Sequence, residues 1–500
     1  MPSLKVEEKS GAPVIDLALD TISKNKQALV FVNTKRSAEK SAEEISKKIK
    51  NVDLSDISEK AKKALSKPTK QCERLAKCLK AGIAFHHAGL HAKQKELIES
   101  NFREGKIKII CCTPTLAAGV DLPAFRAIIR DVTRFTSRGM QPIPVLEYLQ
   151  MAGRAGRPSF DAHGEAIVTT SSDAEKDSVY EKFVLGEPED IFSKLAVEPV
   201  LRTYLLSLIS TKVIQSKEQI YDFFGQTFWA YQFKDMDKLK KNINKMLKLL
   251  ENWTFIQFLD NKYRATLLGR RIAELYVDPL TANHFLECLQ RAKEVKLKPL
   301  SLLLLVCNTL EMWPLLRVKV KEYDLIQEAI AKQETYMIDK EPNMFEPEYD
   351  SYLNAFKTAL MLDDWIEEKD DVYLLENYDV RPGETRAKLE RANWLLYALF
   401  EIARIDQQQF LLKDITKLRF RLKHGAKEEL IPLLRLKNVG RMRARKMFKQ
   451  GIKDLGAVRR AKLEVLEGLL GKKIAHDIKE QVGEKIEAKD NRGQLNNFVQ

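Results

Sequence analysis

The sequence lacks the long apolar segments that membrane insertion and secretion require. No run of about eighteen apolar residues occurs, and the most apolar stretch, residues 300–307, is too short to cross a bilayer. The first ten residues contain no apolar core of the kind found in signal peptides. We therefore expect a cytoplasmic protein that does not act in a membrane.

Paired cysteines are also missing. The chain has six cysteines, and none forms a Cys-x-x-Cys pair, which argues against a zinc ribbon or a disulfide framework. His87 and His91 have the i, i+4 spacing of a metal-binding pair, but Gly89 interrupts the helix that would align them. We therefore expect ordinary buried thiols in a reducing compartment and no metal site.

Acidic residues are in the minority. Asp and Glu total 70 against 84 Lys and Arg, a net charge of +14, in a chain whose 44% hydrophobic content is typical of a globular protein. A basic excess favours an anionic partner, and nucleic acid fits better than a membrane surface because no amphipathic anchor is evident. A generally lysine-rich proteome is the alternative explanation.

Short apolar runs alternate with helical patterns in the first part of the chain. They cover residues 28–33, 83–85, 107–112, 127–131 and 165–169. Such alternation predicts a parallel sheet with helices on both faces, so we interpret residues 1–185 as one α/β domain.

Strand signals nearly vanish after this domain. Residues 186–278 have helical patterns followed by a strand pair near 255–265, which is the order of a winged helix. Residues 279–412 have an all-helical pattern, and residues 413–500 are helical, basic and punctuated by glycine. The 500 residues are thus predicted to form four domains.

The segment Gln-Met-Ala-Gly-Arg-Ala-Gly-Arg, which begins at Gln150, is the most informative motif. Gln150, Arg154 and Arg157 would share one face of a helix, because they lie at positions i, i+4 and i+7. Gly153 and Gly156 would let another backbone or a phosphate approach closely. Two guanidinium groups suit a triphosphate, whereas a solvated basic helix face, the plain alternative, does not explain the glycines.

A second motif follows the apolar run that ends at Cys112. Ligands of open α/β sheets bind where the strands end at their carboxyl side. Thr113 and Thr115 offer hydroxyl groups to a phosphate backbone there, and Gly119 and Asp121 are placed to meet a nucleotide. Taken alone, a strand followed by Thr-x-Thr is weak evidence.

Residues 130–144 link these two motifs. Two extended stretches flank Ser-Arg-Gly, a sequence typical of turns, at Arg138. The pattern predicts a β-hairpin with Phe135 and Met140 at its tip. An ordinary surface hairpin fits the residues equally well.

The basic tail carries a helix-hairpin-helix pattern at residues 434–451. Val439 and Gly440 would form the tight hairpin, whose backbone N–H groups can hold a phosphate. The arginines that add positive charge are Arg441, Arg443 and Arg445. The Gly-x-x-x-Ala spacing recurs between Gly471 and Ala475, so the motif is doubled in this interpretation; a basic helical bundle is the alternative.

Together these stretches resemble the second RecA-like motor domain of a Ski-type, superfamily-two DExH helicase. Residues 31–36 match the motif IV region, 86–90 the next motif, 113–123 motif V and 150–157 motif VI. The whole chain resembles the archaeal Hjm-type repair helicases, which are related to the helicase region of DNA polymerase theta. This resemblance implies a RecA-like domain followed by winged-helix, helical ratchet and helix-hairpin-helix domains.

The resemblance also implies how ATP would be contacted. Arg154 and Arg157 correspond to the arginines that reach the ATP phosphates, and Gln150 corresponds to the coupling glutamine of the same motif. Gly119 and Asp121 complete the expected nucleotide contacts. The catalytic contribution of this chain is thus predicted to be electrostatic.

DNA contacts are expected on the motor domain as well. The hairpin of residues 130–144 corresponds to the strand-separating hairpin of the family. The motor-domain residues expected to contact DNA are Asn33, Thr34, His87, Thr113, Thr115, Phe135 and Arg138.

Residues 384–405 resemble the ratchet helix that runs along the translocating strand. Trp394 corresponds to its base-stacking aromatic residue, a contact worth about 1–3 kcal/mol per base. On the residues alone, a tryptophan among leucines is more typical of a core. The family has two arginines before it; here Arg386 keeps the first, Ala387 replaces the second, and Arg391 is the candidate substitute.

The motifs that hold ATP in this family are not found. No Gly-x-x-x-x-Gly-Lys-Ser/Thr segment and no Asp-Glu dipeptide occur in the 500 residues. We therefore expect ATP and Mg²⁺ to be held mainly by a first motor domain outside this chain, either a separate polypeptide or a missing segment. The chain alone is expected to be inactive as an ATPase.

The predicted function is that of the carboxy-terminal half of an ATP-dependent 3′–5′ DNA helicase. It would act on single-stranded and branched DNA at stalled forks in replication-coupled repair. A non-catalytic module that binds such DNA is the alternative, and a Ski-type RNA helicase fits less well because those proteins have an insertion in place of the tail. A sliding clamp, through residues 494–500, and a single-strand binding protein are further candidate partners.

Overall fold

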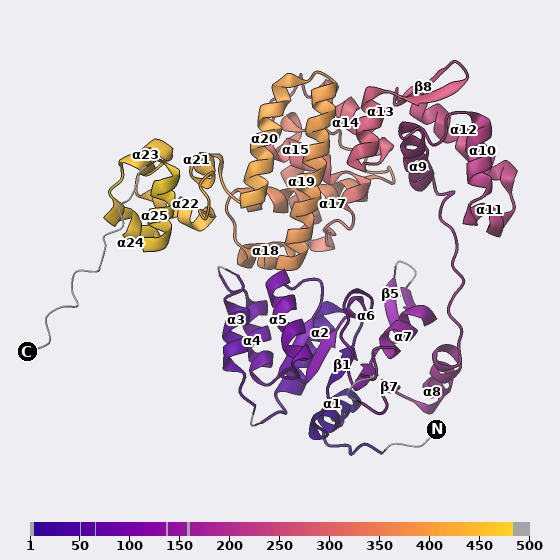
Figure 1. The fold of residues 1–500 in the computed structure, drawn as a ribbon, viewed down its shortest axis with the longest axis vertical. Helices are drawn as coiled ribbons and strands as arrows, with labels where there is room; N and C mark the ends of the chain where they lie inside the picture. The colour runs from indigo at the N-terminus through magenta and orange to yellow at the C-terminus, as the bar shows by residue number, and fades with distance from the viewer. Residues whose placement is uncertain (1–4, 51, 66, 137–138, 158–160, 484–500) are drawn as a thin grey trace, which may run out of the picture. The chain divides into compact units, whose positions relative to one another are not determined.

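The computed structural model describes residues 5–50, 52–65, 67–136, 139–157 and 161–483. The chain divides into two compact units, each described by itself below. Unit 1 contains residues 1–192 and 370–387, and unit 2 contains residues 193–369 and 388–500. Figure 1 traces the order of the elements along the chain.

Unit 1 is built on a five-stranded parallel sheet of order β2-β3-β1-β4-β7. Its strands are β1 (Ala28–Phe31), β2 (Ile83–His86), β3 (Ile109–Cys112), β4 (Arg126–Ile129) and β7 (Glu165–Val168). Every predicted apolar run contributes one strand, so the predicted parallel sheet is confirmed. The runs were detectable because β1 to β4 are buried along their whole length, as strands covered by helices are.

Helices connect these strands. They are α1 (Pro13–Ser23), α2 (Lys35–Ser46), α3 (Ser55–Lys62), α4 (Lys70–Lys80), α5 (Ala92–Arg103), α6 (Thr115–Gly119), α7 (Val145–Ala152), α8 (Asp173–Val179) and the π-helical turn η1 (Tyr180–Val184). A fully buried arginine, Arg126 of β4, donates to the Leu17 carbonyl of α1 at 2.8 Å and to the Glu165 carboxylate of β7 at 2.7 Å. This side chain therefore fixes α1 against the sheet.

Unit 1 also contains a segment that is distant in sequence. It comprises α18 (Asp371–Tyr378) and the first turn and a half of α19 (Pro382–Ile405), whose remainder belongs to unit 2. The predicted domain of residues 279–412 is therefore interrupted at 370–387. Its predicted end at residue 412 also falls inside a helix, α20 (Gln409–His424).

Unit 2 begins with helices followed by a two-stranded hairpin. These elements are α9 (Glu198–Ser210), α10 (Lys217–Gly225), α11 (Phe228–Phe233), α12 (Met236–Asn252), β8 (Ile256–Leu259), β9 (Lys262–Ala265) and α13 (Leu267–Leu275). The strand pair expected near residues 255–265 is confirmed by the antiparallel register of β8 and β9.

The middle of unit 2 is helical. It contains α14 (Pro279–Arg291), α15 (Pro299–Cys307), α16 (Tyr323–Ala331), α17 (Tyr349–Ile366), most of α19, α20, and the short turns η2 (Leu310–Met312), η3 (Val320–Glu322) and η4 (Glu334–Tyr336). Residues 300–307 of α15 are all buried, because a helix that is apolar at nearly every position packs into a core. No helix of the described ranges is long and apolar enough to cross a membrane.

The carboxy-terminal helices have a hydrophobic cluster of their own. They are η5 (Glu428–Leu430), α21 (Ile431–Leu434), α22 (Arg441–Lys449), α23 (Leu455–Arg460), α24 (Leu463–Leu470) and α25 (Lys472–Gln481). Arg138 and the candidate clamp-binding residues 494–500 lie outside the described residues.

Candidate functional site

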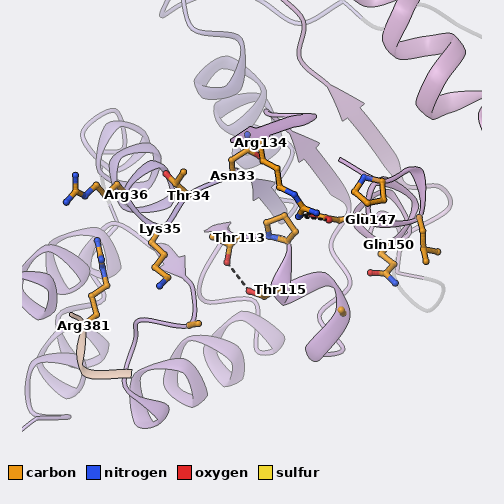
Figure 2. Close-up of a pocket in the computed structure, with 15 residues that line it drawn as sticks. Asn33, Thr34, Lys35, Arg36, Thr113, Thr115, Arg134, Glu147, Gln150 and Arg381 are labelled. Atoms are coloured by element: carbon orange, nitrogen blue, oxygen red, sulfur yellow. Dashed lines mark hydrogen bonds and ion pairs between the residues drawn. The ribbon is translucent and has the colours of Figure 1, made fainter. Parts of the chain in front are cut away.

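A pocket of about 800 Å³ lies in unit 1, where β1 and β3 end (Figure 2). The carboxyl ends of parallel strands meet at one edge of a sheet, which is where the motif residues were expected to converge. Predicted site residues that line this pocket are Asn33, Thr34, Thr113, Thr115 and Gln150. Residues that the sequence interpretation missed also line it: Lys35, Arg36, Arg134, Glu147 and Arg381.

The two threonines of the pocket form a pair. Their hydroxyl oxygens are 2.9 Å apart, with Thr113 largely buried and Thr115 exposed. The Thr113 N–H donates to the His86 carbonyl at 3.3 Å, which fixes the loop to β2. One hydroxyl of the pair donates to the other, so the second hydrogen can be given to an anionic oxygen in the pocket.

Asn33 and Thr34 line the same pocket. The Asn33 side-chain amide donates to the Thr133 carbonyl, and its backbone N–H donates to Asp131 at 3.1 Å. Thr34 is the N-cap of α2, because its hydroxyl oxygen accepts the Ser37 N–H at 3.0 Å. Both side chains therefore have structural partners as well as a position in the pocket.

The predicted hairpin is present beside the pocket. Strands β5 (Thr133–Thr136) and β6 (Gly139–Pro142) pair antiparallel, with Phe135 opposite Met140. Phe135 is 78% exposed and Met140 is 60% exposed, so two large apolar side chains face solvent together. Arg134 of β5 binds Glu147 of α7 at 2.9 Å, which ties the hairpin to the helix that carries Gln150.

The prediction that Gln150, Arg154 and Arg157 share one helix face is wrong. Helix α7 ends at Ala152, so both arginines lie beyond it. Gly156 adopts a φ of 92°, in the left-handed region that favours glycine and breaks helical periodicity. A Cβ atom added to Gly164 would lie 2.3 Å from the Gly156 nitrogen, so the close backbone approach expected at Gly156 is confirmed.

Arg154 lies against the end of α6. Its Nε donates to the Ala117 carbonyl at 2.9 Å, and its Nη1 is 3.3 Å from the Asp121 carboxylate. The Asp121 side chain is 93% exposed, and no atom lies within 4 Å of the position where Gly119 would carry a Cβ. Arg154, Asp121 and Gly119, all expected at ATP, are thus brought together in an open place.

Arg157 lies elsewhere. Its Nε donates to Asp161 at 2.8 Å and its Nη1 to the Gln27 side chain at 2.7 Å. Burial raises the pKa of Asp161, but hydrogen bonds from Arg157 and Lys26 outweigh burial and hold that pKa below its usual range. Gln27 precedes β1 whereas Asn33 follows it, so the two are about 20 Å apart along the strand.

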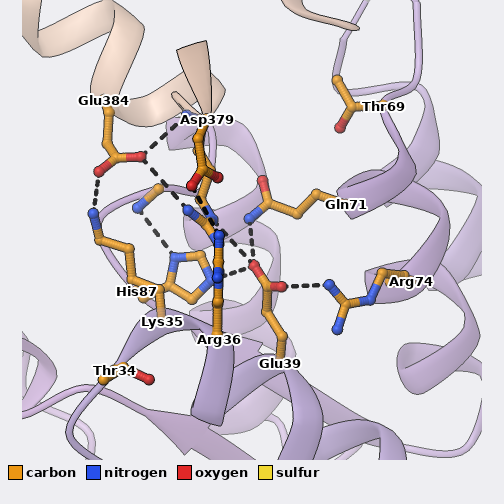
Figure 3. A network of polar contacts seen from close by, with 12 residues as sticks. Thr34, Lys35, Arg36, Glu39, Thr69, Gln71, Arg74, His87, Asp379 and Glu384 are labelled. Atoms are coloured by element: carbon orange, nitrogen blue, oxygen red, sulfur yellow. Dashed lines mark hydrogen bonds and ion pairs between the residues drawn. The ribbon is translucent and has the colours of Figure 1, made fainter. Parts of the chain in front are cut away.

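A buried polar network lies beside the pocket and was not predicted (Figure 3). Its centre is the Glu39 carboxylate of α2, which is 2.9 Å from Gln71, 3.2 Å from His87 and 3.3 Å from Arg381 and which also pairs with Arg74. Burial alone would raise the pKa of Glu39, but these hydrogen bonds and the two arginine charges outweigh burial and lower the pKa to about 2.

His87 belongs to this network and not to the surface. Its side chain is fully buried, so the predicted direct contact between His87 and DNA is wrong. Its Nδ1 accepts the Gly89 N–H at 3.1 Å, which places the ring hydrogen on Nε2, where it donates to Glu39. The role that the structure gives His87 is to hold α2 and the loop after β2 together.

The segment 370–387 is fixed to the rest of unit 1 by charge and by close packing. Its ion pairs are Asp370 with Lys67 at 2.7 Å, Glu376 with Lys70 at 2.9 Å, Asp379 with Arg36 at 2.8 Å and Glu384 with Lys35. The Gly383 N–H donates to the Gly89 carbonyl at 3.1 Å, and a Cβ on Gly383 would lie 2.3 Å from the Ala88 oxygen. The start of α19 is therefore fixed to the rest of unit 1.

The expected strand-contacting residues of α19 have different surroundings. Arg386 is exposed, whereas Arg391 donates to the Trp313 carbonyl. Trp394 is partly buried and its indole N–H donates to the Leu275 carbonyl at 3.0 Å. Trp394 thus has the contacts of a core residue, which was the alternative to a base-stacking role. Base stacking by the exposed part of its ring stays a prediction.

Two of the three tail arginines contact the helical part of unit 2. Arg445 binds Glu368 through Nε at 2.9 Å and Glu429 through Nη1 at 2.6 Å, and these carboxylates raise its pKa. Arg441 lies over the Trp365 ring, 4.6 Å from its centroid. Both side chains are only partly exposed, and both anchor the tail to the helical part of unit 2.

The hairpin of the tail differs in detail from the prediction. Asn438, with φ of 63°, takes the left-handed position, while Gly440 is extended and is the N-cap of α22. Arg443 is exposed, and its Nη1 donates to the Asn438 carbonyl at 2.9 Å. Arg443 is therefore the one of these three arginines that is exposed, and its contact with DNA stays a prediction.

The predicted doubling has a structural counterpart. Gly471 is the N-cap of α25, as Gly440 is of α22. The N–H groups of Ala444 and Ala475 each donate to the carbonyl of the glycine four residues earlier at 3.0 Å, and both alanines are buried. Both small residues thus let a helix pack closely after a glycine turn.

Comparison with known proteins gives matches along most of the chain. Residues 57–159 match the helicase conserved C-terminal domain, residues 164–257 a helix-turn-helix domain, and residues 300–425 domain 4 of archaeal helicases. The ATP-dependent DNA helicase Hel308 of Pyrococcus horikoshii is 40% identical over 499 residues, covering 97% of this chain and 68% of the relative. Hel308 of Pyrococcus abyssi is 40% identical with the same coverage, and that of Methanococcus vannielii is 35% identical over 94% of this chain and 66% of the relative.

Proposed function

The chain belongs to the Hel308 family of ATP-dependent DNA helicases, and from this premise we propose that it is the DNA-gripping part of a 3′–5′ helicase motor. Its substrates are single-stranded and branched DNA at stalled forks, in replication-coupled repair. Residues 1–192 with 370–387 act as the second RecA-like domain, followed by winged-helix, ratchet and helix-hairpin-helix parts.

The observation that carries this proposal is the position of α7 in unit 1. Its residue Gln150 lines the pocket, whereas Arg154 and Arg157, just beyond its end, contact Ala117 and Gln27. One short helix thus connects a pocket with paired hydroxyls to two guanidinium groups. This arrangement suits a glutamine that couples DNA contact to ATP contact.

ATP and Mg²⁺ fit this chain only in part. Arg154 and Arg157 can neutralise charge on the transferred phosphoryl group, with Gly119 and Asp121 beside the nucleotide. The 500 residues contain neither a P-loop nor an Asp-Glu dipeptide that would hold the phosphates and the metal ion. We therefore assign the other wall of the ATP site to a first motor domain outside these residues, on the same polypeptide or a separate one.

DNA would follow a path of polar and apolar contacts. The Thr113–Thr115 pair offers a hydroxyl hydrogen to a phosphate, and Phe135 with Met140 forms an apolar tip able to wedge between bases. On α19, exposed Arg386 meets the strand. Arg443 and the glycine turns of the tail add backbone contacts that read no sequence.

The alternative is a non-catalytic module that binds branched DNA and does not unwind it. The missing P-loop favours this alternative. Both hypotheses require the chain to bind DNA. Fluorescence anisotropy with single-stranded, forked and duplex DNA across a salt series tests this binding. We expect the logarithm of affinity to fall linearly with the logarithm of salt, with weaker binding of duplex.

A valine substitution at the pocket makes this test specific. Thr115→Val should weaken single-strand binding about fivefold to tenfold, since it removes a hydroxyl donor. Thr211→Val, the same change at the exposed residue that follows α9, is the control. Equal affinity of both variants for single strands would remove the pocket from the DNA path.

A further inference from the structure

Three different metal-donor side chains meet in the helical part of unit 2. His284 and Cys288 lie one turn apart on α14, and Asp339 follows η4, 55 residues after His284. The His284 Nε2 is 3.2 Å from the Asp339 carboxylate and 3.8 Å from the Cys288 sulfur. The donor atoms of all three residues lie within 4.8 Å of one another.

The two distances from the His284 Nε2 are close to the edges of a tetrahedral zinc site. Zinc binds nitrogen and oxygen at about 2.0–2.2 Å and sulfur at about 2.3 Å, so neighbouring donors are roughly 3.3–3.7 Å apart. An imidazole, a thiolate and a carboxylate are a donor set that suits zinc and similar divalent ions better than calcium or magnesium.

The surrounding residues support the donors. Asn308 donates to the Asp339 carboxylate at 2.8 Å, which orients its oxygens. Arg291 donates to the Cys288 sulfur at 2.9 Å and to the Ile338 carbonyl at 3.0 Å.

The cluster is enclosed but reachable. Cys288 and Asp339 are buried, whereas the His284 side chain is 26% exposed and lines a pocket of about 360 Å³. Asn308 lines the same pocket. This opening gives an ion a path and leaves room for a water molecule as fourth ligand.

We propose that His284, Cys288 and Asp339 bind one divalent transition-metal ion of the zinc type, which clips the loop around Asp339 to α14. Cysteine spacing did not predict this site, because it contains one cysteine and its third ligand, Asp339, is distant in sequence from α14. The site is independent of the ATP and DNA contacts assigned to unit 1. Its fourth position is open to solvent, and its role is to stabilise the ratchet part.

Cobalt titration of the full chain tests this directly. After removal of metals with a chelator, one equivalent of Co²⁺ should produce a thiolate-to-cobalt charge-transfer absorption, and Zn²⁺ should displace it. Cys288→Ser should lose that absorption, whereas Asn283→Ala, on the same helix but outside the cluster, should keep it. Absence of the absorption in the wild type, or its persistence in Cys288→Ser, would overturn the proposal and leave an ordinary His–Asp ion pair.

A second variant tests the site in case Cys288→Ser fails to fold. Asn308→Ala keeps every donor, so the absorption at saturation should persist while affinity for Co²⁺ falls about 10-fold to 100-fold. An unchanged affinity in this variant would contradict the assignment of Asp339 as a ligand.

Discussion

Two regions of the chain carry glycines followed by arginines, and the structure treats them in opposite ways. In unit 1, Arg154 is held by a backbone carbonyl and by a carboxylate that is 93% exposed. In the tail, Arg445 is held by two carboxylates of unit 2 at 2.9 Å or less. The comparison teaches that the groups paired with an arginine, more than its sequence motif, decide whether its guanidinium can bind a phosphate.

The largest expected effect separates these two arginines in a completed motor, with a P-loop domain supplied. Arg154→Ala should reduce kcat for ATP about 1000-fold, as loss of an arginine finger does, while affinity for single-stranded DNA stays unchanged. Arg445→Ala should leave kcat within about twofold. Similar kcat losses in both variants, measured by phosphate release, would erase the distinction.

Glu39 extends the comparison within unit 1, because its carboxylate pairs with two arginines, Arg74 and Arg381, that have a structural role. Its folded pKa of about 2 lies below the usual value near 4.5, so its contribution to stability is complete above pH 4.5 and is lost as pH falls towards 2. The shift corresponds to about 3 kcal/mol at neutral pH. We expect Glu39→Gln to lose about that much stability.

Urea unfolding from pH 7 to pH 3 measures this effect. The wild type should lose stability more steeply below pH 4.5 than Glu39→Gln does, since the variant has no carboxylate to protonate there. Glu43→Gln, an exchange on the same helix at a partly exposed carboxylate, is the control. Parallel profiles for wild type and Glu39→Gln would show that the network contributes nothing.

Arg445→Ala tests the tail on the stability side. Removal of the guanidinium leaves Glu368 and Glu429 without this partner, and we expect a loss of about 1–3 kcal/mol in the unfolding free energy. Arg459→Ala on α23, with no side-chain ion pair among the described residues, is the matched control. Denaturant unfolding followed by tryptophan fluorescence provides the measurement.

The smallest expected effect concerns Arg443. Because this arginine is exposed, Arg443→Ala should reduce the salt slope of DNA binding by about one unit. Arg445→Ala should leave the slope unchanged, since its charge is already balanced. A larger slope change in Arg445→Ala than in Arg443→Ala would reverse the comparison.

Local patterns predicted the parts of the fold that short stretches of sequence specify. The parallel strands, the β5–β6 hairpin and the β8–β9 pair were all found where apolar runs and turn residues indicated them. Contacts between distant residues were not predictable. Arg36 and Asp379, 343 residues apart, bring residues 370–387 into unit 1, and no periodicity reports such a pairing.

The sequence predicted many of the residues of the candidate site, but it did not predict how they are arranged. Helical spacing assumed an unbroken helix through Arg157, but Gly156 takes a left-handed conformation after α7 has ended. His87 matched a family motif, yet its burial depends on Glu39, which no motif singled out. Motifs identify which residue types gather, whereas partners and backbone angles determine which of them are available.

The most direct test of the central claim is the ATPase activity of the purified 500-residue chain with single-stranded DNA. The account predicts salt-dependent DNA binding and no ATP turnover above background, because Arg154 and Arg157 supply only one wall of the nucleotide site. DNA-stimulated hydrolysis that Arg157→Ala abolishes would contradict it, since a complete ATP site would then lie within these residues.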